Sequence, residues 1–422
     1  MLGLGTGVRV RSVLPLLYGR LQIVVETAVE RPVCKECGGR VESKGRPRRT
    51  LADLTCFGQS VDLVWRKRRW KCVAVDCPVK TWTEAHDAIA GPRAKMTARA
   101  ARWATVEVGR FARAVSDVAA VLGCNWHTVD ATVMRWGQEL LDADVDRVAG
   151  TDSVGLDEIL HVKTGRFRTK NWATSIVDVR DGKLLDLVEG RTAQPAIDWF
   201  DAQPACWIAG IRYGTLDLSG PYRKVFNDVF DTIDLVADPF HVVKLANEAL
   251  DEVRRRVQQE TMGHRGRSGD PLYGARKLLV MADERLDDNS RAKLTGLLAA
   301  GDPYGEIKDT WHAKETIRMT YQIGSHGEAV EFVTRLSAEL ADDTSLPDEV
   351  NRLGRTLRTW TTEITNWHKA RVTNGPTESI NNLIKRVKRG AFGFRRFKSL
   401  RIRALLYAGK PNWNLLNTIT PH

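Results

Sequence analysis

The apolar pattern of residues 151–237 is compatible with few folds, because it predicts a definite order of strands and helices. The Asp181-Gly182 dipeptide between two alternating segments indicates a β-hairpin, since hairpin turns favour this pair. One strand precedes the hairpin, and helices and strands alternate after it. The predicted strands are 154–160, 173–179, 183–189, 207–217 and 233–237, and the predicted helices are 195–202 and 221–230. Three antiparallel strands followed by helix-strand units predict a mixed sheet of the α/β class.

Two acidic residues fall on the first and fourth of these strands. The order of elements is that of the ribonuclease-H-like fold, which brings the ends of those two strands together. Asp157 lies inside a strand, where aspartate is disfavoured, and Asp217 ends the fourth strand. Two carboxylates at close range repel unless a cation neutralises them, and hard oxygen ligands suit Mg²⁺. Taken singly, either aspartate could equally be a solvated residue at a strand end.

Length and charge indicate several domains and a polyanionic partner. At 422 residues the chain exceeds one ordinary hydrophobic core, so two or three domains are expected. The net charge is +12, from 64 Lys and Arg against 52 Asp and Glu, and the basic residues are concentrated in two segments, 40–71 and 369–410. Neither a membrane-spanning stretch nor a signal peptide is recognisable in the sequence, so we expect a cytoplasmic protein.

The cysteine spacing predicts a zinc site near the N-terminus. The chain has seven cysteines, an odd number that does not suit a disulfide framework. Cys34 and Cys37 form a C-x-x-C pair before two glycines, and Cys72 and Cys77 form a wider pair after the segment 64–70, which alternates like a strand. Four thiolates can hold Zn²⁺ tetrahedrally. Cys56 or His86 could replace one ligand, and a set of buried thiols is the simpler alternative.

Residues 97–141 change to a helical pattern that contains a predicted helix-turn-helix. A short helix capped by Ser116 is expected to end at Leu122, followed by a turn at 123–125 and a second helix over 126–136. In such a motif the second helix enters the major groove of DNA. Its candidate DNA contacts are His127, Thr128, Asp130 and Arg135. An ordinary helical hairpin explains the same pattern without DNA.

A third acidic residue begins a predicted helix near the C-terminus. Pro376 suits the first helical turn, and Glu378 lies in that turn, where the helix dipole favours any acid. The dipole explains neither Asn381 and Asn382 nor the cationic face that follows. Basic residues expected to hold the phosphate backbone of DNA continue from there: Lys385, Arg386, Lys388, Arg389, Arg395, Arg396 and Lys398.

Together these motifs resemble the ISL3 family of DDE-type transposases from bacterial insertion sequences. The matching segments are the cysteine pairs and residues 155–158, 215–222, 238–244 and 374–403. The resemblance implies that Asp157, Asp217 and Glu378 form the DDE triad, and that Asp238 and His241 form a D-x-x-H motif. Asp238 also ends a strand and competes with Asp217 for the second place, which strand order gives to Asp217.

The resemblance also implies cofactors, partners and a reaction. Two Mg²⁺ ions, or Mn²⁺, would be held by the triad, and structural Zn²⁺ by the cysteines. The substrate would be double-stranded DNA, namely the terminal inverted repeats and the target, bound by a homodimer or higher oligomer at the bacterial nucleoid. The expected reaction is strand cleavage and strand transfer. Alternatives are a catalytically inactive DNA-binding regulator and a nuclease of the same fold; a serine or tyrosine recombinase is less favoured.

The expected domains follow from these assignments. They are a zinc-binding domain at 1–90, a helix-turn-helix segment at 91–145, a ribonuclease-H-like catalytic domain at 150–250 and 373–410, and an all-helical insertion at 251–372. The insertion contains a seam of apolar residues at alternating three- and four-residue spacing: Val350, Leu353, Leu357, Trp360, Ile364 and Trp367. We expect this seam to belong to an intramolecular core rather than to a dimer interface.

Overall fold

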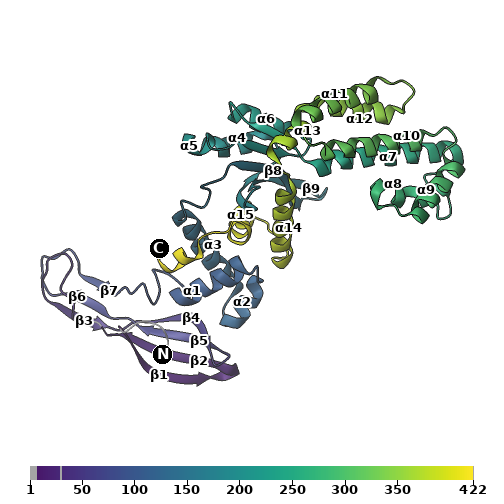
Figure 1. Ribbon diagram of the computed structural model, residues 1–422. Helices are drawn as coiled ribbons and strands as arrows, with labels where there is room; N and C mark the ends of the chain where they lie inside the picture. The colour runs from purple at the N-terminus through teal and green to yellow at the C-terminus, as the bar shows by residue number, and fades with distance from the viewer. Residues whose placement is uncertain (1–6, 29–30, 422) are drawn as a thin grey trace.

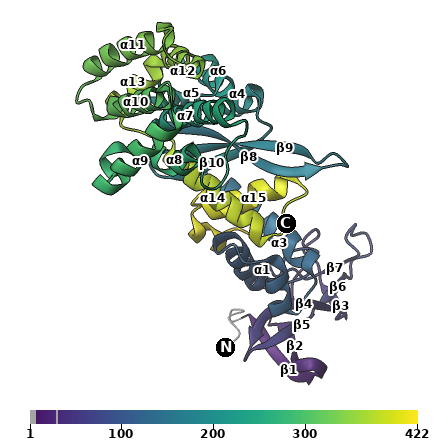
Figure 2. The same cartoon turned by 90° about the vertical axis from the view of Figure 1, so that its right-hand side faces the viewer.

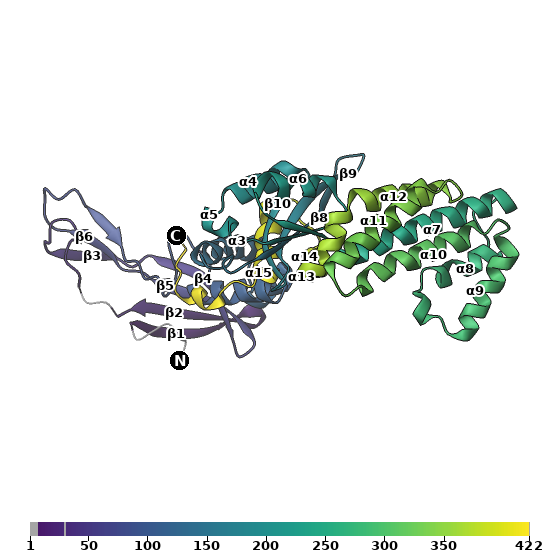
Figure 3. The same ribbon diagram turned by 45° about the horizontal axis from the view of Figure 1, so that its top comes forward.

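The computed structural model describes residues 7–28 and 31–421. In Figure 1 the chain runs from an N-terminal β-structure, through a group of helices, to a central sheet and a helical arm. Figure 3 shows the arm and the N-terminal β-structure at opposite ends of the molecule. None of the helices in the described part of the chain is long and apolar enough to cross a membrane.

The N-terminal β-structure consists of two sheets. Strands β1 (Val8–Leu16), β2 (Arg20–Thr27), β5 (Gln59–Arg66) and β4 (Arg48–Cys56) form one sheet in that order. The smaller sheet contains β3 (Val41–Gly45), β6 (Arg69–Cys72) and β7 (Thr81–Thr83). The single strand expected at 64–70 is wrong, because the chain leaves the first sheet at Arg66 and enters the second at Arg69. Trp65 is buried at the end of β5 in the first sheet, and Trp70 is buried in β6 of the second sheet.

A helical group follows, with α1 (Ala98–Thr105), a π-helical turn (Val106–Arg110), α2 (Val115–Leu122) and α3 (Trp126–Ala143). The predicted Ser116 cap is wrong: the N-cap is Ala114, two residues earlier, and the Ser116 hydroxyl donates to the adjacent Asp117. Gly123 ends α2 in the left-handed conformation, at φ 61°. The Asn125 side chain then caps α3 by accepting the His127 N–H at 2.7 Å.

The central sheet has the order β10-β9-β8-β11-β12. Its strands are β8 (Ser153–Thr164), β9 (Thr169–Asp178), β10 (Lys183–Glu189), β11 (Tyr213–Leu216) and β12 (Asp234–Ala237). The first three pair antiparallel, and β11 pairs parallel with both β8 and β12. The predicted succession of strands and helices is therefore confirmed. Helices α4 (Ala193–Asp201), α5 (Ala205–Ile208) and α6 (Gly220–Val229) connect these strands.

The strand predicted at 207–217 is wrong in its first half. Residues 205–208 form the short helix α5, and β11 begins only at Tyr213. Trp207 packs edge-on against Trp199 and donates its indole N–H to the Val148 carbonyl at 2.7 Å. Trp207 is apolar because it packs in the core beside the sheet. Alternation in the sequence cannot distinguish such a residue from a buried strand residue.

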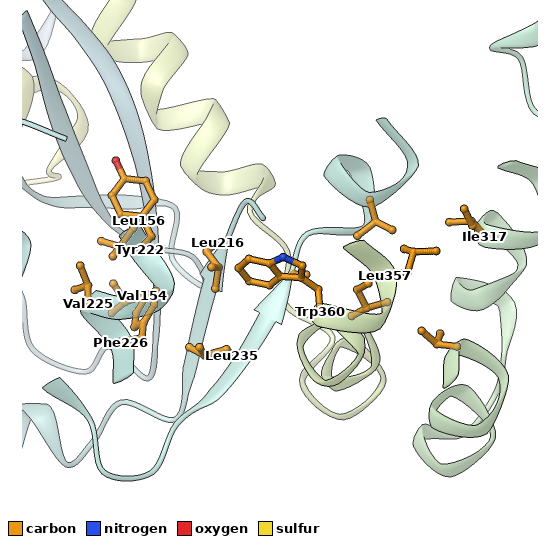
Figure 4. Packing of buried hydrophobic residues seen from close by; sticks show 14 of the residues in the cluster. Val154, Leu156, Leu216, Tyr222, Val225, Phe226, Leu235, Ile317, Leu357 and Trp360 are labelled. Atoms are coloured by element: carbon orange, nitrogen blue, oxygen red, sulfur yellow. The ribbon is translucent and has the colours of Figure 1, made fainter. Parts of the chain in front are cut away.

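The helical arm contains α7 (Pro239–Met262), α8 (Pro271–Leu279), α9 (Asp288–Gly301), α10 (Glu306–Met319), α11 (His326–Asp342), α12 (Asp348–Thr359) and α13 (Thr361–Ala370). The apolar seam is divided between α12 and α13. Its members from Val350 to Ile364 join one intramolecular core with the sheet residues Leu216 and Leu235, and Figure 4 shows Trp360 between Leu357 and these strands. The intramolecular interpretation of the seam is confirmed for these residues.

The C-terminal helices connect the sheet with the helical group α1–α3. Helix α14 (Gly375–Gly390) and α15 (Phe397–Ala408) lie between the central sheet and α1–α3 (Figure 2). On α15, Leu405 packs with sheet residues, whereas Ile402 and Leu406 pack with α3. A Cβ on Gly137 of α3 would lie 2.7 Å from Leu406, so the glycine allows the two helices to approach closely.

Candidate active site

Two neighbouring strands of the central sheet bring Asp157 and Asp217 together. In the parallel ladder Leu156 pairs with Leu216, so each aspartate follows a paired residue at the same edge. Both carboxylates line a cavity of about 750 Å³ that α6 and the start of α4 complete. The Asp157 side chain lies deeper than a solvated strand-end residue would, and this pairing could be expected from the strand order alone.

Helix α14 is held against both aspartates by two asparagines. Asn374, at the N-cap, donates from Nδ2 to Asp217 Oδ1 at 2.9 Å, and Asn381 donates from Nδ2 to Asp157 Oδ2 at 2.7 Å. These two bonds join residues that are separated by 157 and 224 positions in the chain. From the sequence, Asn381 has no predicted contact and Asn374 no predicted role, although their separation by two helical turns places them on one helical face.

Glu378 lies on the same stripe of α14 as these asparagines. It is four residues after Asn374 and three before Asn381, the spacing that places helical side chains on one face. Its side chain is exposed, and no residue in the described ranges makes a hydrogen bond or ion pair with its carboxylate. Glu378 therefore offers a free carboxylate on the helical face that contacts Asp157 and Asp217.

A glycine sets how closely α14 approaches the sheet. A Cβ built on Gly155 of β8 would lie 2.2 Å from the Thr377 hydroxyl of α14 and 2.7 Å from Val179. No side chain can occupy that space, because atoms are not found so close together without a bond. Gly155, two residues before Asp157, thus allows the first turn of α14 to rest directly on the strand.

His241 bridges two aspartates at the start of α7. Its Nε2 lies 3.0 Å from Asp217 Oδ2, and its Nδ1 lies 3.0 Å from Asp238 Oδ2. Burial alone would lower the pKa of His241, but the hydrogen bond to Asp238 and the charge of Asp217 raise it above its usual value. A doubly protonated imidazole can donate to both carboxylates, so His241 fixes the orientation of Asp217.

Asp238 occupies a different position from Asp217. It is 4% exposed, and its second oxygen accepts the backbone N–H of Asn374 at 2.9 Å. Unlike Asp157 and Asp217, Asp238 does not line the cavity beside the strand ends. Its contacts suit a residue that positions His241 and the N-terminus of α14.

The electrostatics of the pair suit a bound cation. Burial and then the negative charge of Asp217 raise the pKa of Asp157 to about 6, and burial raises the pKa of Asp217 despite His241 and Asn374. Carboxylate oxygens are the ligands that Mg²⁺ prefers, and each retains a lone pair beyond its one hydrogen bond. Asp157 and Asp217 thus form a donor set that fits a divalent metal, with Glu378 on the adjacent helix face.

Comparison with known proteins identifies the family. The ISL3-type DDE model, described as "Transposase", matches residues 154–404, which is more than half of the chain and includes all three acids. The chain belongs to the ISL3 family of DDE transposases.

Curated relatives of this transposase agree. It is 27% identical over 310 residues to the transposase for insertion sequence element IS1557 of Mycobacterium tuberculosis, covering 67% of the chain and 65% of that relative. It is 24% identical over 406 residues to the transposase for IS1001 of Bordetella parapertussis, covering 91% of both. The chain thus spans just under two thirds of the first relative and nearly all of the second.

The transposase also has a cysteine cluster compatible with zinc. The sulfur atoms of Cys34, Cys37, Cys72 and Cys77 all lie within 4.8 Å of one another, with Cys34–Cys77 at 3.7 Å and Cys37–Cys72 at 3.6 Å. A tetrahedron with Zn–S bonds of about 2.3 Å has S–S edges of about 3.8 Å. Backbone N–H groups of Cys37 and Glu36 lower the pKa of Cys34 to about 7, which favours a thiolate. Cys56 and His86, the possible substitutes, are not in this cluster.

The candidate DNA contacts of this transposase differ in exposure. The exposed ones are His127, Lys385, Arg386, Arg389, Arg395, Arg396 and Lys398. Thr128, Asp130 and Arg135 are half-buried, and the Arg135 Nε is buried without a hydrogen-bond partner in the described structure. Lys388 is also half-buried and donates to the Leu160 carbonyl of β8, so it ties α14 to the sheet.

Proposed function

We propose that this chain is a transposase whose Asp157, Asp217 and Glu378 form the DDE triad of a ribonuclease-H-like catalytic domain. The observation that carries the proposal is the pair of asparagine bonds from α14 to the two aspartates, with Glu378 between the asparagines on one helical stripe. Three carboxylates would then converge from β8, β11 and α14. The helical arm is an insertion between the last strand of this domain and α14.

In this proposal the three carboxylates bind two Mg²⁺ ions, or Mn²⁺. When bound, such ions activate an attacking water or DNA 3′-hydroxyl and stabilise the leaving oxygen of a phosphodiester. Asn381 and Asn374 hold the two aspartates in place, and His241 keeps Asp217 oriented through its Nε2. Glu378 is free to turn toward the cavity when the metal is bound. These residues would serve both DNA strand cleavage and strand transfer.

The DNA substrate would be recognised by the N-terminal half. The relatives are transposases of insertion sequence elements, so we infer that the substrate is the terminal inverted repeats of such an element and its target DNA. The cysteine cluster would hold structural Zn²⁺, α3 would enter the major groove, and the exposed basic residues of 385–398 would hold phosphates. Pairing of two ends would require a dimer or higher oligomer. The expected location is the bacterial nucleoid.

Excision from a plasmid tests this proposal. The gene with its native flanking DNA is placed between two plasmid markers, and the donor site is sequenced after expression of the wild type or of Glu378→Gln. We expect repaired or emptied donor sites with the wild type alone, since glutamine keeps the size of the side chain but loses its charge. Equal excision by both proteins would refute the role of Glu378. DNA binding without strand breakage by either protein would instead favour a regulator.

A further inference from the structure

A second cavity lies where the helix-turn-helix meets the C-terminal helices. It has a volume of about 460 Å³ and is lined by the start of α2, the first turn of α3, the loop 390–396 and the start of α15. Segments more than 260 residues apart in sequence, such as His127 and Arg396, therefore share one surface. From the sequence alone, these two residues are predicted as separate DNA contacts.

An arginine with unused donors lines this cavity. Arg403 is 2% exposed, and its Nε and Nη2 are buried without a hydrogen-bond partner in the described part of the chain. The Phe394 ring lies 5.8 Å from its guanidinium carbon. A buried guanidinium with free N–H groups is costly, so structures rarely retain one without a ligand for it.

The surroundings of Arg403 favour an anion. Arg395, Arg396 and His127 line the cavity near its exposed side, and the N-terminus of α3 adds the positive end of an 18-residue helix. Asp130 is the one acidic residue of this lining; it forms no ion pair with Arg403 in the described structure. Burial raises the pKa of Asp130, while the charges of Arg403, His127 and Arg396 oppose that rise.

We propose that this cavity binds a backbone phosphate of DNA, with Arg403 as the anchoring cation beneath it. The N–H fork of arginine matches phosphate oxygens in pairs, and a turn of the Arg403 guanidinium would bring its buried, unpaired Nε and Nη2 to the cavity that the residue lines. The inference rests on the proposed function in that the phosphate is taken to belong to DNA held by α3. Because α3 and α15 both line the cavity, one phosphate would fix the helix-turn-helix relative to the helices that lead to Glu378.

Two variants test the site. Arg403→Met removes the cation and keeps most of the side-chain volume. Ser399→Glu leaves Arg403 in place but adds a carboxylate one turn earlier on α15, where a glutamate can reach an arginine four residues on. This glutamate would take the place of the phosphate. Arg355→Met, on the exposed face of α12, is the control for loss of one positive charge.

The first measurement is the binding of a DNA duplex, carrying the native flank of the gene, to the full-length protein at several salt concentrations. For Arg403→Met and Ser399→Glu we expect affinity to fall about ten-fold and the slope of log K against log salt to decrease by about one. Arg355→Met should behave like the wild type. Unchanged slopes in both cavity variants would overturn the proposal, and if Arg403→Met does not fold, Ser399→Glu decides.

The second measurement separates this site from the proposed function. Thermal unfolding of the full-length protein is compared in inorganic phosphate and in chloride at matched ionic strength. Phosphate stabilises folded proteins in general, so we expect it to raise the Tm of the wild type and of Arg355→Met by more than that of Ser399→Glu. This test needs neither excision nor DNA, so a failure of transposition would leave it standing. A phosphate effect of equal size in Ser399→Glu would contradict the site.

Discussion

At the scale of single residues, the candidate site carries an electrostatic cost that metal would relieve. The carboxyl of Asp157 has a pKa of about 6 in the fold, against an ordinary 3.8. The folded state thus keeps the proton to a higher pH than the unfolded state, so this group destabilises the metal-free protein increasingly as pH rises from about 4 to about 6. Above that range the cost is constant.

The loss of stability caused by the charged Asp157 leads to a prediction for Asp157→Asn. In the presence of a chelator we expect the variant to be more stable than the wild type at pH 7 by about 1–2 kcal/mol, after allowance for partial exposure. The difference should shrink as pH falls toward 4, because the wild-type carboxyl is then protonated. Thermal unfolding across this pH range measures it. A stability gain that does not change with pH would show that the charge of Asp157 is not its cause.

The two rival aspartates can be distinguished by the same kind of conservative change. Asp217→Asn should abolish strand cleavage because it removes a carboxylate that faces the cavity, and it should also lower the Tm, since one amide cannot accept both the Asn374 and the His241 donors. Asp238→Asn should reduce cleavage without abolishing it and cost about 1–3 kcal/mol, because an amide cannot accept both the His241 and the Asn374 donors. Cleavage assays and unfolding are run on both variants. If Asp238→Asn abolished cleavage and Asp217→Asn only reduced it, Asp238 would take the second place in the triad.

At the scale of elements, the cysteine cluster should hold its small sheet together. The core around it contains only Val41, Trp70 and the buried cysteines, with Val79 and Trp82 packed beside them. So little apolar area cannot stabilise a sheet alone. We expect Cys72→Ser to lose zinc, measured by elemental analysis, and to become sensitive to protease within 31–83. Cys206→Ser, an exposed cysteine outside the cluster, is the matched control. Zinc retained in full by Cys72→Ser would contradict the site.

The helices and strands also differ in how far the sequence could predict them. Strand order and the position of Asp157 followed from alternation and from one hairpin turn, which are local signals. The strand prediction at Trp207 was wrong because an apolar residue packed beside a sheet resembles a strand residue. The cap prediction at Ser116 was wrong because a serine inside a helix resembles an N-cap. Helical spacing could place Asn374 and Asn381 on one face, but the partner of Asn374 and the cavity of Arg403 were not predictable, since they depend on how distant elements pack.

At the scale of the whole molecule, α14 and α15 connect the three functional regions. The first turn of α14 carries Glu378 on the helical face whose asparagines contact the aspartates, and its last residue, Gly390, lines the cavity beside α3. Sixteen residues of helix span about 24 Å. The helix thus runs from the candidate catalytic carboxylates to the candidate DNA-binding surface. Its position between the central sheet and the helical group α1–α3 is visible in Figure 2.

The most direct test of the three-carboxylate site is Mg²⁺-dependent cleavage by the purified full-length protein of DNA that carries the native flanks of the gene. The wild type is compared with Asp157→Ala, Asp217→Ala and Glu378→Ala, and DNA binding is measured on the same samples. We expect the wild type to cleave only with Mg²⁺ or Mn²⁺, and each variant to bind DNA but lose cleavage by at least 1000-fold, on the order of 4 kcal/mol of transition-state stabilisation. Cleavage at the wild-type rate by any one of the three variants would contradict the assignment of that residue and with it the proposed site.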